Sequence, residues 1–75
     1  MADVEQERRN ALSAKIQAER DRLSDFIVAE RDRIRKECGR DSVEYSRRVD
    51  YEQINVWGKL LADSSAQQAA WLKEQ

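Results

Sequence analysis

The chain has 75 residues, 39% of them charged, and its 14 Lys and Arg nearly balance its 15 Asp and Glu. A chain this short forms one small domain at most and rarely buries enough apolar surface to be stable without a staple or a partner. Because it has no histidine and one cysteine, an internal disulfide and a Cys/His zinc site are excluded, and we expect no metal or cofactor.

The first predicted element is a helix over about residues 4–38. Asp3, with Gln6 three residues later, is suited to cap its N-terminus. The sequence AERDRL (18–23) returns eleven residues later as AERDRI (29–34). Eleven residues make about three helical turns, so residues at this spacing stay on one face. The apolar residues on this grid are Leu12, Ile16, Leu23, Ile27, Ile34 and Cys38. We therefore predict a long charged helix with one apolar seam.

Opposite charges stand at helical spacing on the remaining faces of this helix. The expected pairs are Glu5 with Arg9, Glu19 with Arg22, Glu30 with Arg33, and Asp32 with Lys36. Each such pair stabilises a helix by only about 0.2 to 0.5 kcal/mol. The interleaving of both signs favours an ordinary solvated face over a phosphate-binding strip.

A turn is predicted at about residues 39–42. Gly39 suits the left-handed position after a helix, and Asp41 with Glu44 forms a capping box, with Ser42 as a competing cap. The alternative is one continuous helix, because the eleven-residue grid continues through Tyr45 and an interior glycine costs only about 1 kcal/mol.

The second predicted helix covers about residues 43–73 and carries two apolar lines. One line is Val49, Val56, Leu60 and Trp71, and the other is Ile54, Trp57, Leu61 and Leu72. If the chain folds back near residue 40, Leu23 lies near Trp57 and Leu61, and Ser64 lies opposite Ile16. The expected fold is therefore an all-α, two-helix antiparallel hairpin.

Two helices enclose no core, so at least one apolar line of the second helix should remain uncovered. We expect a second copy, in a dimer or tetramer, or another protein to cover it. The candidate interface residues are Ile54, Trp57, Leu61, Trp71 and Leu72, because large aromatic and aliphatic side chains dominate interface energetics. The alternative for both tryptophans is that they fill the seam of the hairpin.

The expected function is a non-catalytic protein–protein interaction module, a small subunit or adaptor of a larger assembly. No enzyme activity or small-molecule substrate is expected, because the chain lacks histidine, a nucleophile elbow and a glycine-rich phosphate loop. The alternative function is a dimeric helical-bundle regulator that binds nucleic acid through Arg8, Arg9, Arg47 and Arg48, which the balanced net charge disfavours.

The sequence also bears on location. No apolar run approaches the roughly 20 residues of a membrane span, and the first twenty residues are too charged for a secretory signal. The mixed charges of the first helix disfavour an amphipathic membrane-surface helix. We therefore expect a soluble, intracellular protein without a membrane partner.

Overall fold

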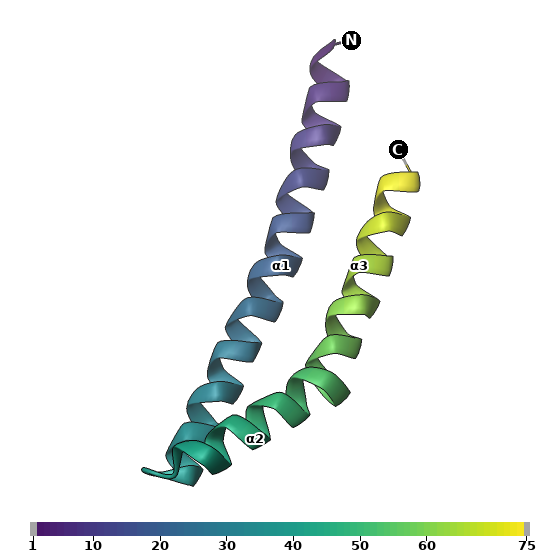
Figure 1. Cartoon of the computed structure of the whole chain (residues 1–75). Coiled ribbons are helices and arrows are strands. Elements are labelled where there is room, and N and C mark those ends of the chain that lie inside the picture. The colour runs from purple at the N-terminus through teal and green to yellow at the C-terminus, as the bar shows by residue number, and fades with distance from the viewer. Residues whose placement is uncertain (1, 75) are drawn as a thin grey trace.

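The computed structural model describes residues 2–74, which form an all-α antiparallel hairpin (Figure 1). The first arm is one long helix, α1 (Ala2–Cys38). The second arm consists of α2 (Ser42–Glu52), a π-helical turn η1 (Gln53–Trp57) and α3 (Gly58–Lys73), which follow one another without a loop. The hairpin is elongated, with extents of 59 × 18 × 11 Å. The predicted fold class is thereby confirmed, and the helix bounds lie within two residues of those expected.

The turn between the arms has the local chemistry that the sequence predicts. Gly39 adopts φ of +62°, and its N–H donates to the Arg35 carbonyl at 3.0 Å. The Asp41 side chain accepts a hydrogen bond from the Glu44 N–H at 3.0 Å and caps α2. The left-handed backbone conformation is far more accessible to glycine than to residues with a Cβ. A helix commonly ends at a glycine in this conformation, as it does here. The alternative of one continuous helix is therefore wrong.

The N-terminus of α1 differs from the expectation. The helix already includes Ala2, so Asp3 lies within its first turn instead of capping it. The Gln6 side chain donates to Asn10 Oδ1 at 3.0 Å, one turn further along. Asp3 and Glu5 still complement the positive end of the helix dipole.

The apolar seam of α1 faces the second arm over most of its length. Leu23 and Ile34, which are eleven residues apart, are buried, and the other predicted seam residues are half-buried. Glu19 and Glu30 occupy the same stripe and are also half-buried. The eleven-residue repeat therefore places a carboxylate beside each buried aliphatic residue of the seam.

The π-helical turn decides which residues of the second arm face α1. Tyr45, Val49 and Glu52 are half-buried, and the next residue on an uninterrupted α-helical stripe would be Val56. Instead, Val56 is 40% exposed and Trp57 is 1% exposed. A π-helical turn holds one extra residue, which rotates everything beyond it by about one position. Beyond the turn, the residues facing α1 are Leu60, Ser64, Gln68 and Trp71.

The second arm is bowed, so that α2 leaves the turn at an angle to α1 before α3 runs beside α1 (Figure 1). Arg35 lies against Tyr45 near the turn, whereas Ser64 bonds to Glu19 further away. Ser64 was expected opposite Ile16, about one helical turn from its observed partner. The bow and the extra residue of the π-helical turn change the register, because the second arm then uses more residues per unit length of hairpin.

Candidate protein-interaction surface

The structure divides the predicted interface residues into two groups. Ile54, Leu61 and Leu72 are 75%, 47% and 56% exposed. Trp57 is the largest fully buried side chain, so its area is already used within the hairpin. Trp71 is half-buried against α1. The three aliphatic residues therefore offer open apolar surface, and Trp57 belongs to the core.

Cations of α1 cover three aromatic rings of the second arm. Lys15 Nζ lies 4.4 Å from the centre of the Trp71 ring. The guanidinium carbons of Arg31 and Arg35 lie 5.7 Å and 4.0 Å from the Trp57 and Tyr45 rings. Such contacts hold a cation over the negative face of the ring. These contacts were not predicted from the sequence, although four of the five aromatic residues lie in its second half and the basic residues are dense in the first.

Among the described residues, three side-chain hydrogen bonds join the arms, the longest of them from Arg48 Nη1 to Cys38 Sγ at 3.7 Å. The Ser64 hydroxyl donates to Glu19 Oε1 at 3.1 Å and accepts from Gln68 Nε2 at 3.2 Å. Near the turn, Arg48 Nη2 donates to Glu37 Oε2 at 2.6 Å. Because the half-buried carboxylate of Glu19 needs a partner, its contact with Ser64 favours one alignment of the arms. The position of Glu19 four residues before Leu23, on the same face of the helix, was the sequence signal for the contact with Ser64.

Arginine contacts lower the pKa values of both cross-arm carboxylates. The hydrogen bond from Arg22, and to a smaller extent that from Ser64, lowers the pKa of Glu19 below its ordinary 4.5, although partial desolvation opposes the shift. The hydrogen bond from Arg48 is the main cause of the lowered pKa of Glu37, with help from Arg33. Both groups therefore favour the folded chain in their charged forms.

We expect the hairpin to lose stability in acid through these two groups. Their folded-state pKa values lie below the unfolded value, so their contribution is complete above about pH 4.5 and declines as the pH falls through the lowered values. Thermal melts followed by circular dichroism at neutral and acidic pH measure the loss. The double variant Glu19→Gln with Glu37→Gln should melt lower at neutral pH and show a smaller drop in acid. An unchanged acid drop in this variant would contradict the assignment.

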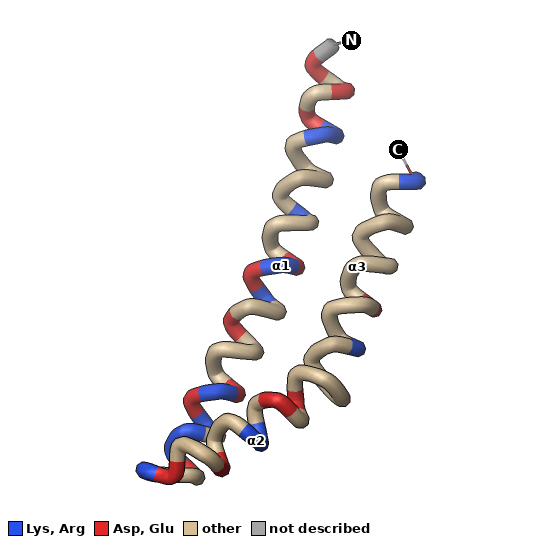
Figure 2. Tube along the Cα trace, in the orientation of Figure 1, with Lys and Arg blue, Asp and Glu red and all other residues tan. Residues whose placement is uncertain are grey.

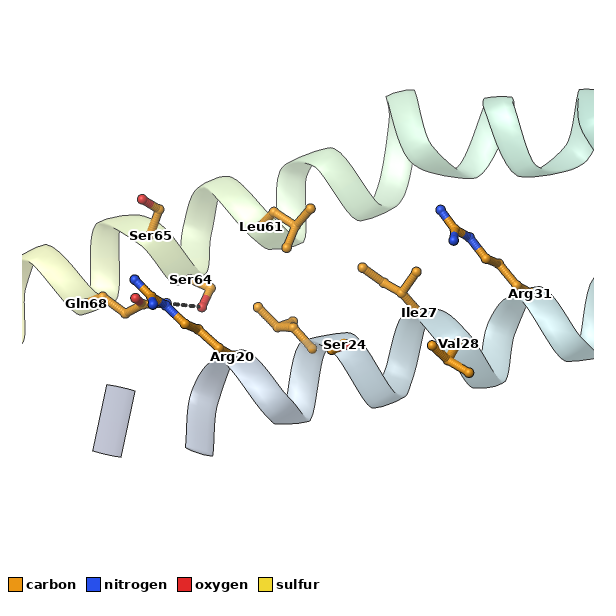
Figure 3. Close-up of a pocket in the computed structure, with 10 residues that line it drawn as sticks. Arg20, Ser24, Ile27, Val28, Arg31, Leu61, Ser64, Ser65 and Gln68 are labelled. Carbon is orange, nitrogen blue, oxygen red and sulfur yellow. Dashed lines mark hydrogen bonds between the residues drawn. The ribbon is translucent and has the colours of Figure 1, made fainter. Parts of the chain in front are cut away.

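A groove runs between α1 and α3 on one flank of the hairpin (Figure 3). Its apolar floor includes Ile27 and Leu61, and Arg20 and Arg31 stand toward its two ends. The remaining lining residues are Leu23, Ser24, Val28, Ser64, Ser65 and Gln68. No carboxylate lines this groove, although both signs of charge alternate along α1 (Figure 2). The groove is therefore an open apolar trough with a basic rim.

Residues 2–74 contain no group of three side chains placed to hold a metal ion. Within the same range, no helix is both long enough and apolar enough to cross a membrane. Of the arginines in the alternative nucleic-acid reading, Arg48 is already paired with Glu37.

Comparisons with protein-family models, with curated proteins and with solved structures found no match to this chain.

Proposed function

We propose that this chain is a non-catalytic protein–protein interaction module that associates through the apolar flank of its second arm. The observation that carries the proposal is an excess of exposed over buried apolar side chains. Among the described residues, Leu23, Ile34 and Trp57 are the buried hydrophobic residues. Nine large hydrophobic side chains are exposed: Val4, Phe26, Val28, Val43, Tyr51, Ile54, Val56, Leu61 and Leu72.

The thin core gives a thermodynamic reason for association. Full burial of one large apolar side chain contributes about 1.5 to 3 kcal/mol, and three such side chains are few for a chain of this length. Fixing each residue of two long helices opposes folding by about 1 to 2 kcal/mol of backbone entropy. Covering further apolar surface in a complex would shift this balance toward the folded hairpin.

The exposed leucines of α3 are well placed to share one interface. Leu61 and Leu72 are eleven residues apart in one helix, so they lie on the same face. Leu61 also lines the groove, and Leu72 continues the same face toward the open end of the hairpin, beside Leu12 and Arg9. Ile54 adds exposed area just before α3 begins. A partner lying along this flank would cover Leu61 and Leu72 together.

Solution mass and helicity, measured together over a hundredfold concentration range, test this proposal. The double variant Leu61→Asp with Leu72→Asp should lower association by about tenfold or more, because burying a charge at an apolar interface is unfavourable. Helicity extrapolated to the dissociated chain should change little. Val43→Asp is the control, since Val43 is also aliphatic and exposed but lies beside the turn.

The outcomes separate the possibilities. Association that falls in the double variant and not in the control supports the proposal. A weakly helical monomer at every concentration also supports it, and indicates that the covering surface belongs to another protein. A monomer that stays fully helical and melts cooperatively on its own would contradict the proposal, because such a hairpin needs no cover.

A further inference from the structure

The charged residues of α1 divide into paired and unpaired sets on different faces. The described residues contain four short ion-pair contacts, which join Glu19 with Arg22, Glu30 with Arg33, and Glu37 with both Arg33 and Arg48. By helical spacing, Arg22 and Arg33 lie on the other side of the α1 seam from Arg20 and Arg31, which line the groove. None of the four contacts involves Arg20 or Arg31 at the groove, or Asp21, Asp25 or Asp32.

The groove presents its positive charge at a fixed spacing. Arg20 and Arg31 occupy the same position in the two copies of the repeat, eleven residues apart, which corresponds to about 16.5 Å along a helix. Arg31 also lies over the Trp57 ring, a contact that restrains its guanidinium at the rim. The groove floor between the two arginines includes Ile27, Val28 and Leu61.

The back of α1, opposite its seam, carries the complementary pattern. At about 100° per residue, a single stripe on this side contains Ala14, Ala18, Asp21, Asp25 and Asp32, all of them exposed. We name these five residues the Ala/Asp stripe. Asp21 and Asp32 are also equivalent positions of the repeat, eleven residues apart. Asp21 accepts a hydrogen bond from Gln17 Nε2 at 2.9 Å, which leaves further acceptor sites on its carboxylate.

We propose that the groove binds the Ala/Asp stripe of α1 from a second copy of this chain. The carboxylates of Asp21 and Asp32 then lie against Arg20 and Arg31 of the first copy, because one repeat sets both spacings. This inference rests on the proposed function, of which it names the partner and the face.

The contact joins two different surfaces, so it is head-to-tail. Each added copy still offers its own free groove or its own free stripe, and such an arrangement extends into a chain of molecules unless a rotation closes it. A symmetric dimer through two facing grooves is disfavoured, because it would bring four arginines together. The groove therefore favours an acidic helix over a copy of itself.

A nucleic acid fits this surface less well. Single-stranded nucleic acids bind by stacking bases on open aromatic rings beside basic residues. None of the described residues that line the groove is aromatic, and the exposed rings of Phe26 and Tyr51 are not among them. The Ala/Asp stripe and the overall net charge of −1 would also repel phosphates.

The first experiment compares two double variants that remove the same charge from the same helix at the same spacing. Arg20→Gln with Arg31→Gln should weaken self-association by about tenfold in sedimentation equilibrium, as expected for two charge contacts at a partly covered surface. Arg22→Gln with Arg33→Gln alters a different face; it should lower the melting temperature, because these arginines pair with Glu19, Glu30 and Glu37, and should weaken self-association less than the groove variant does. Added salt should weaken the self-association of the unmodified chain. It should weaken the self-association of Arg20→Gln with Arg31→Gln less.

The second experiment tests the head-to-tail geometry by charge reversal. One variant carries Arg20→Glu and Arg31→Glu, and the other carries Asp21→Lys and Asp32→Lys. Each alone should be monomeric, because its groove and its stripe now carry the same sign of charge. Mixed in equal amounts, they should associate again in alternating order, since each groove then meets a stripe of the opposite charge on the other variant.

Several results would overturn this inference. Equal weakening by the two glutamine variants, or a mixture that stays monomeric, would exclude the groove contact while the proposed function stands. A weakly helical monomer at low salt would assign the groove to another protein. Tight binding of a labelled 20-nucleotide single-stranded DNA, lost in Arg20→Gln with Arg31→Gln, would assign it to nucleic acid. A stable helical monomer would end both proposals.

Discussion

Trp57→Ala is expected to unfold the hairpin at room temperature. Trp57 is 1% exposed and lies in the π-helical turn, where the bowed second arm meets α1. Replacing a buried Trp by Ala typically costs about 3 to 5 kcal/mol, which is comparable to the whole stability of a chain this small. The variant also leaves Arg31 without the ring it covers. Circular dichroism with urea titration measures the loss of helix and of cooperativity.

Trp71→Ala is the control for this prediction. It removes the same side chain from the same arm, but Trp71 is half-buried near the open end of the hairpin and carries Lys15 over its ring. We expect a clearly smaller loss, with a cooperative transition retained. Equal unfolding of both variants would contradict the structure, in which Trp57 is buried and Trp71 is only half-buried.

Gly58→Ala is expected to destabilise the chain, although alanine in an ordinary helix is about 1 kcal/mol more favourable than glycine. A Cβ at this position would lie 2.8 Å from the Gln53 carbonyl oxygen, which accepts the Gly58 N–H and closes the π-helical turn. The conflict is with backbone, so the turn itself must change. Losing its extra residue would rotate Trp57 away from α1 and expose it. Tryptophan fluorescence reports the exposure of Trp57, and the midpoint of a urea titration reports the loss of stability.

A deletion distinguishes this explanation from simple loss of stability. Asn55 lies within the π-helical turn, and its side-chain amide donates to the Tyr51 carbonyl at 2.9 Å. Removing Asn55 should convert the turn to ordinary α-helix and keep α3 in phase with α1. Gly58→Ala should then be neutral or stabilising. Ser65→Ala, at an exposed site of α3, should have little effect in either background.

If the groove binds the Ala/Asp stripe of a second copy, the same repeat serves two purposes. Its aliphatic positions, Leu23 and Ile34, hold the hairpin together. Its arginine and aspartate positions then hold successive hairpins together, because all of them recur at eleven residues. Folding and assembly would thus share one spacing but use different residues. Substitutions at Arg20, Asp21, Arg31 and Asp32 should therefore weaken assembly without the loss of stability expected for substitutions at the seam.

The sequence by itself determined the features that depend on local chemistry. The seam of α1 follows from an eleven-residue repeat that matches three helical turns. The turn follows from a glycine in the left-handed region and the Asp41 cap within a few residues of each other. Ion pairs within α1, such as Glu19 with Arg22, follow from helical spacing. Each of these features involves residues within about one to three helical turns of one another, so the local sequence is sufficient to predict it.

Only the tertiary structure decided which side of the second arm faces α1. The sequence offered two apolar lines, and the observed face takes Val49, Leu60 and Trp71 from one and Trp57 from the other. Trp57 takes the place of Val56 on this face because of the extra residue of the π-helical turn, which is unfavourable in an isolated helix and is held here by the burial of Trp57. The gain comes from contacts with residues far away in the chain, and no local pattern records it.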